Sequence, residues 1–415
     1  MKIIVISHLY PNKAYPARGT FIRELFLNIT GKAPADMLVP TVRALPFTRK
    51  WDYTHAPFLA DREAERVHYL SFPHKQFPKI IQRNITAALV PRLKRESGVE
   101  SRITQNSGFD PNITRGSGIL AHFHWLYPDA LAIPALEAAG VPTVLTIHGS
   151  DWYKTRQPGS LRFLLDECLR STRAVLTVGK TLREDIIREL PELASKVHVI
   201  YNVLDFTRFR PVDDRTNLLH DLQWAPGKQH VLCVANIRYE KGIDVLLEAA
   251  KTFDKDHVQF HLIGNVPGDR YSNRMVGEIR RRLNITLYPP VPHSDITTYY
   301  QACDVTVLPS RREGFGLSVA EAIACGKPVV ATKSGGPEDI VNDDNGILVE
   351  IESPGQLAEG IRQVLSGSFA HKPQNIRQSI RHKFDSRSVL NRLFTIYHDV
   401  LNRRNVGESS LDLPM

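Results

Sequence analysis

The stretch Ser310-Arg-Arg-Glu-Gly-Phe-Gly-Leu-Ser-Val-Ala-Glu-Ala-Ile-Ala-Cys-Gly-Lys-Pro-Val-Val330 decides how the second half of the chain folds. The apolar run Asp304–Leu308 just before it predicts a buried strand of a parallel sheet. A short loop with two glycines follows, and a helix is expected from about Gly316 until Gly326-Lys-Pro ends it. The next apolar run, 329–332, predicts another strand, so the stretch forms a strand–loop–helix–strand unit.

The loop between that strand and that helix is typical of an anion-binding site. Free backbone N–H groups gather at a helix start, where the helix dipole favours negative charge. Gly314 and Gly316 have no Cβ, so a ligand can approach the backbone closely. Amides that bind phosphate, beside the carboxylates of Glu313 and Glu321 for sugar hydroxyls, are what a nucleotide-sugar requires. The plainer alternative is that Glu313 caps the helix and Glu321 faces solvent.

The composition describes an ordinary globular protein. Charged residues make up 23% and hydrophobic residues 42% of 415 residues, which is enough for two domains with cores of their own. The four cysteines lack Cys-x-x-Cys spacing and are interpreted as buried thiols in a reducing compartment. The first apolar run is too short for a signal peptide, and no run is long enough to span a bilayer. We therefore expect a cytoplasmic protein.

The net charge of +9 lies mostly in the first 100 residues, where 16 Lys or Arg face 8 Asp or Glu. The segment Lys75–Arg95 concentrates the cations and places apolar residues between them. One interpretation is a basic amphipathic face that lies on anionic lipid, at the inner face of the membrane. The other is an ordinary surface helix whose apolar side joins the core. No nucleic-acid-binding motif accompanies the charge, so nucleic acid is not expected as a partner.

The second half continues the alternation of strands and helices, which predicts a doubly wound α/β sheet. Its first strand, 231–235, leads into Arg238 and Lys241, three residues apart at a helix start. From there both cations can reach one diphosphate. The alternative is a solvated helix start in which Glu240 is their partner. Asp254 and Asp256 follow a helix rather than a strand, and no metal site is expected.

The first half also places polar side chains at strand ends. His122 and His124 point the same way from one expected strand and could ligate a metal, but no third ligand stands nearby. We therefore interpret them as wall histidines. His148 and Asp151 follow the next strand, at the sheet edge where parallel α/β sheets bind ligands.

The run around Glu313 and Glu321 resembles the retaining glycosyltransferases of family four, the group 1 transferases. Their signature is two glutamates separated by seven residues around Gly-Phe-Gly. The resemblance is strong over 202–350, recognisable at Gly19 and His148, and faint over 36–117. Gly19 follows an arginine where the family usually has a second glycine, and Val203 stands in place of a usual glycine between the domains.

The resemblance implies the GT-B fold: two facing, Rossmann-like, doubly wound domains with a C-terminal helix that crosses back to the first. The expected parts are an acceptor-binding domain over 1–205, a nucleotide-sugar-binding domain over 206–385, a crossover helix over 386–404 and a disordered tail over 405–415. From its composition, the segment 207–228 is expected to be a linker, and the polar, Gly-rich stretch 97–117 a long loop that is either mobile or gates the acceptor.

The resemblance also implies roles for single residues. Catalysis is assigned to Glu313, His148, Arg238 and Lys241. Donor binding is assigned to Gly19, Arg238, Lys241, Val291, Glu313, Gly314, Phe315, Gly316, Leu317 and Glu321. Acceptor contacts are assigned to His122, His124 and Asp151, the last of which orients nearby groups or the acceptor.

The implied reaction is retaining, metal-independent transfer of a hexosyl group from a UDP- or GDP-sugar to a saccharide or lipid-linked acceptor, in polysaccharide or glycoconjugate biosynthesis. No cofactor is expected besides the nucleoside-diphospho-sugar, which is a co-substrate. Two alternatives remain open. A sugar-nucleotide epimerase would need a glycine fingerprint after the first strand, and none stands there. A catalytically silent binding protein of the same fold would have lost site residues, yet Arg238, Lys241, Glu313 and Glu321 are all present.

Overall fold

The computed structural model describes residues 1–9, 19–43, 67–73, 78–97, 118–282, 284–367 and 372–406. Contacts divide the chain into two units. The first contains 1–178, 183–200 and 390–415, and the second contains 179–182 and 201–389. Most of the segment expected to be an acceptor loop, 98–117, and most of the expected tail, 407–415, lie outside the described residues.

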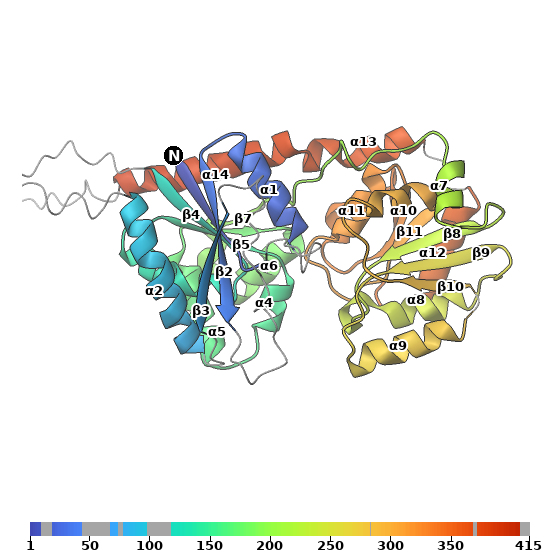
Figure 1. Cartoon of the computed structure of the whole chain (residues 1–415), viewed down its shortest axis with the longest axis horizontal. Coiled ribbons are helices and arrows are strands. Elements are labelled where there is room, and N and C mark those ends of the chain that lie inside the picture. Colours follow the sequence, from blue (N-terminus) through green and yellow to red (C-terminus); the bar gives the residue numbers. More distant parts are fainter. Residues whose placement is uncertain are drawn as a thin grey trace, which may run out of the picture. The chain divides into compact units, whose positions relative to one another are not determined.

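The first unit is built on a parallel sheet that has seven strands among the described residues, in the order β3-β2-β1-β4-β5-β6-β7 (Figure 1). Its strands are β1 (Lys2–Ile6), β2 (Ala35–Arg43), β3 (Val67–Pro73), β4 (Ile119–His124), β5 (Thr143–Ile147), β6 (Ala174–Thr177) and β7 (Val197–Val199). Residues 3–6 of β1 are at most 1% exposed. Because helices cover both faces of such a sheet, a central strand such as β1 is an almost continuous apolar run.

The helices of this unit are α1 (Thr20–Thr30), α2 (Pro78–Ser97), α3 (Ile133–Ala138), α4 (Ser150–Lys154), α5 (Ser160–Ser171), α6 (Lys180–Glu189) and most of α14 (Ser386–Val406). Helix α2 contains most of the basic segment. Its apolar stripe, Ile81, Ile85, Leu89 and Leu93, is buried in the core. The second interpretation of that segment therefore holds, and its apolar side is not available to lipid.

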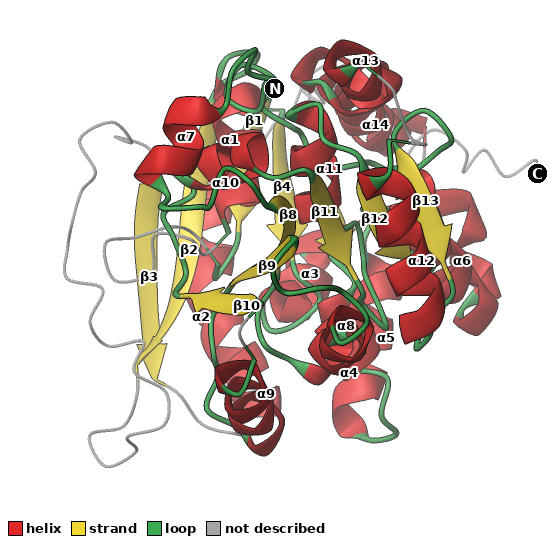
Figure 2. Ribbon diagram, turned by 90° about the vertical axis from the view of Figure 1, so that its right-hand side faces the viewer, coloured by secondary structure: helices red, strands yellow, loops and turns green. Residues whose placement is uncertain are grey.

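The second unit has a parallel sheet in the order β10-β9-β8-β11-β12-β13 over the described part of the chain. Its strands are β8 (Gln229–Val234), β9 (Val258–Ile263), β10 (Ile285–Tyr288), β11 (Val305–Leu308), β12 (Val329–Thr332) and β13 (Gly346–Val349). Helices α8 (Ile243–Ala250) and α9 (Arg270–Arg280) lie on one side of the sheet, and α10 (Ile296–Ala302) and α11 (Leu317–Ala324) on the other (Figure 1). An α-helix follows each strand from β8 to β11, whereas only a short 3₁₀ helix (Pro337–Asp339) lies between β12 and β13. Figure 2 shows the helices in red and the strands in yellow.

Three helices of the second unit were not foreseen: α7 (Thr216–Asp221), α12 (Pro354–Leu365) and α13 (Pro373–Phe384). The expectation of a linker over 207–228 is wrong, because this segment forms α7 and buries Leu219 and Trp224 against the unit. The expected crossover helix over 386–404 is α14, which runs two residues further.

The end of α14 belongs to the first unit. Leu393 and Tyr397 are fully buried there, and the Tyr397 hydroxyl lies 2.6 Å from Nδ1 of His122 on β4. Two Rossmann-like units with a final helix that returns to the first confirm the fold class that the sequence predicted.

The strand order reverses once in each sheet, between β1 and β4 and between β8 and β11. At such a switch point the two neighbouring strands continue into helices on opposite faces, which leaves a crevice at their carboxyl ends. The candidate residues cluster there. Arg238 and Lys241 follow β8, and Glu313 follows β11, while His124 is the last residue of β4.

The loops after β8 and β11 approach each other closely at the switch point of the second unit, and this close approach gives a stability prediction. Gly242 has φ +61°, and a Cβ there would lie 2.0 Å from the carbonyl oxygen of Pro309. Gly268 has φ +82° but no atom within 4 Å of its Cβ position, so it serves as the control. We expect Gly242→Ala to lower the free energy of unfolding by at least ~2 kcal/mol, and Gly268→Ala by about 1 kcal/mol. Denaturant titration measures both, and equal losses would contradict the proposed clash.

Candidate functional site

Two loops meet at the switch point of the second unit through an ion pair. Lys241 Nζ lies 2.5 Å from Oε1 of Glu313, and the Ser310 hydroxyl donates to the same oxygen at 2.7 Å. The Glu313 side chain is 9% exposed and that of Lys241 29%. Within the described residues Oε2 of Glu313 has no hydrogen-bond donor, so it is left to accept from a ligand hydroxyl. The structure thus brings Lys241 and Glu313 together.

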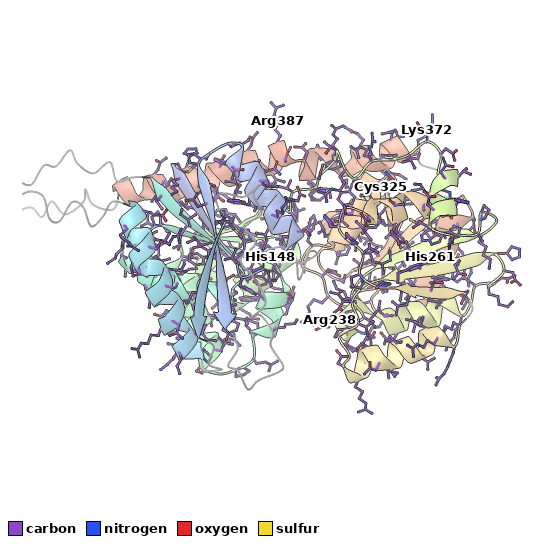
Figure 3. All side chains as sticks on the ribbon, viewed as in Figure 1. His148, Arg238, His261, Cys325, Lys372 and Arg387 are labelled. Atoms are coloured by element: carbon purple, nitrogen blue, oxygen red, sulfur yellow. The ribbon has the colours of Figure 1, made fainter. Side chains whose placement is uncertain are left out.

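Arg238 is placed differently from Lys241. It is exposed at the end of the extended segment after β8, and no carboxylate of the described residues lies within salt-bridge distance of it (labelled in Figure 3). Its charge nevertheless acts on Asp269, whose pKa is lowered chiefly by the backbone N–H of Ser272 and to a smaller extent by Arg238. Of the two cations expected to reach one diphosphate, Lys241 is therefore internally paired, whereas Arg238 is available to an anion.

An arginine that sequence analysis missed ties the two loops together. Arg311 donates to both carboxylate oxygens of Asp244, at 2.9 and 2.8 Å, and to Glu352 at 2.8 Å. Its guanidinium also lies 4.0 Å from the ring centroid of Tyr239. The side chain is 14% exposed, and the hydrogen bonds to Asp244 raise the pKa of Arg311. A bidentate pair of this kind fixes geometry as well as charge, so it holds the loop of Lys241 against the loop of Glu313.

Glu321 lies on α11 and is 5% exposed, which excludes the alternative of a solvated face. One of its carboxylate oxygens lies 2.9 Å from Nε2 of His293, and the other accepts from the Tyr300 hydroxyl at 2.9 Å. Arg208 lies 2.6 Å from Nδ1 of His293, which must then accept, so Nε2 carries the proton that is donated to Glu321. Burial, together with Glu321, raises the pKa of Tyr300. His293, Tyr300 and Arg208 were missed by sequence analysis.

The glycine loop before α11 has the geometry of an anion site. Gly316 caps the helix in the left-handed region at φ +93°, and Phe315 beside it is buried. Leu317 begins the helix, so its N–H is among the first four that have no partner within the helix. Gly314 precedes these residues in the same loop. Val291 lies elsewhere in the unit, partly buried between β10 and α10 and two residues before His293.

The switch point of the first unit contains His148, directly after β5 (labelled in Figure 3). Asp151 accepts from the backbone N–H of His148 at 3.0 Å and from that of Leu126 at 2.8 Å. Burial raises the pKa of Asp151, and these N–H groups oppose that shift. Asp151 therefore orients the loops after β4 and β5. Gly19 caps α1 in the left-handed region at φ +62°.

His124 contacts His148, whereas His122 does not line a site. Nδ1 of His124 lies 3.1 Å from Nε2 of His148, and the two rings stack at 5.3 Å between centroids. His122 is fully buried, and its two nitrogens lie within 2.7 Å of the hydroxyls of Thr146 and Tyr397. The acceptor contact assigned to His122 is therefore withdrawn, because a residue enclosed in this way supports the strand instead.

His8 and Asp129, at the switch point of the first unit, were also missed by sequence analysis. The backbone N–H of His8 and its ring Nδ1 both bond Oδ2 of Asp129, at 2.9 and 2.8 Å. Asp129 is fully buried, and its pKa is raised by burial and lowered by His8, with burial the larger effect. The pairing joins residues 121 positions apart, so no local signal could have revealed it.

A cluster of metal ligands and a membrane-spanning helix are both absent from the described part of the chain. Over the described ranges, no three His, Cys, Asp or Glu side chains are grouped so that they could hold a metal ion. Over the same ranges, no helix combines the length and the hydropathy that a membrane span requires.

Comparison with known families assigns this arrangement to a class. The model described as "Glycosyl transferases group 1" matches residues 214–383, and the model described as "Glycosyltransferase Family 4" matches residues 116–208. Together they match more than half of the 415 residues. The chain belongs to the group 1 glycosyltransferases of family four.

Individual relatives agree with that class. An uncharacterised glycosyltransferase of Methanocaldococcus jannaschii is 28% identical over 76% of this chain and 83% of its own length. A D-inositol 3-phosphate glycosyltransferase of Xylanimonas cellulosilytica is 28% identical over 60% of this chain and 63% of its own length. Among solved structures, Anabaena HepE in complex with UDP and glucose superposes with a TM-score of 0.74 at 18% identity, over 96% of this chain and all of HepE.

Buried histidines predict acid sensitivity. Burial lowers the pKa of His124 in the first unit and of His261 in the second to about 3, from an ordinary 6.5. The unfolded chain therefore binds more protons than the folded chain between these values, and stability falls as the pH is lowered through that window. We expect each of these two histidines to lower the stability of its unit by about 1.4 kcal/mol per pH unit below pH ~6.5. Denaturant midpoints at pH 7, 6 and 5 measure this, and an unchanged midpoint would contradict it.

Proposed function

We propose that the chain transfers a hexosyl group from a UDP- or GDP-sugar to a hydroxyl of a saccharide or lipid-linked acceptor, with retention at the anomeric carbon and without a metal. The observation that carries this proposal is the Lys241–Glu313–Ser310 cluster at the switch point of the second unit, beside the start of α11. The likeness of the fold to HepE, which was crystallised with UDP and glucose, supports the donor class.

The donor diphosphate is proposed to lie between the exposed guanidinium of Arg238 and the N–H groups at Gly316 and Leu317. The guanidinium carries a full positive charge and the N–H groups partial positive charge, so both stabilise the charge that develops on the leaving phosphate. Lys241 stands beside this position and brings a third positive charge, which its pairing with Glu313 holds in place.

The sugar and the ribose are proposed to bind the two glutamates. Oε2 of Glu313 accepts from a sugar hydroxyl while Oε1 stays bonded to Lys241 and Ser310. Each oxygen of Glu321 has one donor, His293 or Tyr300, and keeps a further lone pair for the ribose diol. The backbone near Val291 is proposed to contact the base.

The reaction is proposed to follow same-face attack. The bond from the anomeric carbon to the phosphate oxygen breaks, and the acceptor oxygen bonds that carbon from the same side. The acceptor proton passes to the departing phosphate oxygen, so the chain itself needs no proton acceptor. His148, held through its backbone by Asp151, and His124 are proposed to contact the reacting sugar and the acceptor in the first unit.

We expect Glu313→Gln and Lys241→Ala each to lower kcat at least about 100-fold, because each removes a preorganised charge at the reacting sugar or phosphate. Glu240→Gln is the matched control, since this exposed carboxylate lies in the Lys241 loop and forms no side-chain hydrogen bond or ion pair with the described residues. Release of UDP or GDP from the sugar nucleotides measures turnover, and circular dichroism checks folding. Normal turnover in a folded variant would remove that residue from the mechanism.

The donor is identified by thermal shift. UDP, GDP and their glucose, galactose, mannose and N-acetylglucosamine derivatives are each titrated against the full chain. A ligand that binds only the folded state raises the melting temperature by mass action. If no nucleotide raises it, the proposed transferase function fails.

A contact with anionic lipid at the inner membrane face is proposed only for the charges of α2, because its apolar stripe is buried. Lys79, Arg83 and Arg95 are exposed on this helix. We expect the chain to co-sediment with vesicles of anionic phospholipid at low salt and to be released at about 0.5 M salt, where charges are screened. Charge reversal at these three positions should abolish binding, and salt-independent binding would contradict the proposal.

A further inference from the structure

The loop after β1 presents a histidine that is anchored on one side only. His8 is bonded to Asp129 through its backbone N–H and its ring Nδ1, and its side chain is 21% exposed. The carboxylate is fully buried beneath it, at the start of the segment that leads into α3. Nε2, on the other side of the ring, has no hydrogen-bond partner within the described part of the chain.

This anchoring fixes which ring nitrogen carries the proton. The backbone N–H of His8 can only donate, so Oδ2 of Asp129 is an acceptor. Nδ1 bonds that same oxygen, so it must be the protonated nitrogen. In the neutral imidazole Nε2 is then unprotonated, and it can accept a hydrogen bond.

Aromatic rings lie near the imidazole ring of His8. The ring of Trp125 lies 6.0 Å from that of His8 and 4.6 Å from that of His148, between centroids. Phe21 lies 5.0 Å from His148 and 6.3 Å from Trp125. Trp125 holds φ +79°, which is rare for a bulky residue, and its indole N–H is buried without a partner in the described structure. A strained residue with an unsatisfied donor is typical of a ligand site.

We propose that Nε2 of His8 accepts a hydrogen bond from a hydroxyl of the acceptor, and that the rings of Trp125 and Phe21 cover the apolar face of a neutral sugar ring there. This inference rests on the proposed transferase function and extends it to a residue and an acceptor class. A neutral, hydroxyl-bearing ring suits this site because its polar edge meets an imidazole acceptor while its C–H face meets aromatic carbon.

The test uses two amide substitutions that separate anchoring from ligand binding. His8→Asn retains an N–H donor at the position of Nδ1, so it keeps the bond to Asp129 and loses the acceptor at Nε2. His8→Gln reaches the position of Nε2 with its carbonyl oxygen, so it keeps the acceptor and loses the anchor. A purely structural histidine would tolerate Asn better than Gln, whereas a ligand-binding one would tolerate Gln better.

The probes are methyl α- and β-glucopyranoside, galactopyranoside and mannopyranoside, titrated against full-length protein with ¹⁵N-labelled histidine. We expect the His8 resonances to show protonated Nδ1 and unprotonated Nε2, and the Nε2 signal to move with at least one glycoside. Because the variants lack His8, their affinity for that glycoside is measured from the shifts of the His148 resonances. His8→Asn should lower the affinity about tenfold, and His8→Gln less than about threefold.

Three results would overturn the inference: an Nε2-protonated tautomer, no response of His8 to any glycoside, or wild-type affinity in His8→Asn. The nucleotide thermal shift is independent of all three. If nucleotides bind but His8→Asn behaves as wild type, only this inference fails. If the His8 response holds but no nucleotide binds, the proposed donor chemistry fails instead.

Discussion

In the second unit, β8 and β11 lie side by side and continue into helices on opposite faces of the sheet. The two connecting loops therefore begin as neighbours, and they remain together only if something joins them. The Arg311–Asp244 pair and the close approach of Gly242 to Pro309 supply that connection. The Lys241–Glu313 ion pair depends on it, because its two members come from different loops. The chemistry proposed for the site thus begins with the strand order of the sheet.

Two of the three cations in this site are paired with carboxylates of the chain itself. Lys241 is compensated by Glu313, and Arg311 by Asp244 and Glu352, whereas Arg238 is left exposed. Holding the first two cations in fixed pairs lowers the reorganisation that ligand binding requires, which is how preorganised charge stabilises a transition state. Arg238 is exposed and has no carboxylate partner among the described residues, so it is the cation available to pair with an anion.

Local sequence patterns predicted the fold class and the positions of Glu313, Glu321, Arg238 and Lys241, because strand ends, glycine loops and helix starts are encoded by adjacent residues. They did not predict what these side chains would touch. Arg311 and Asp244 lie 67 residues apart, and His8 and Asp129 lie 121 apart, so only the sheet order brings them together. His122 was misassigned for the same reason, since its partner Tyr397 comes from the last helix.

That last helix has a consequence for how the protein is made. The core of the first unit includes Leu393 and Tyr397, which emerge from the ribosome after the whole second unit. Domains usually fold in order as the chain is synthesised. Here the core of the first unit stays incomplete until residues 393–397 have been synthesised. The second unit, by contrast, is complete at residue 389, so it can fold first although it is synthesised second.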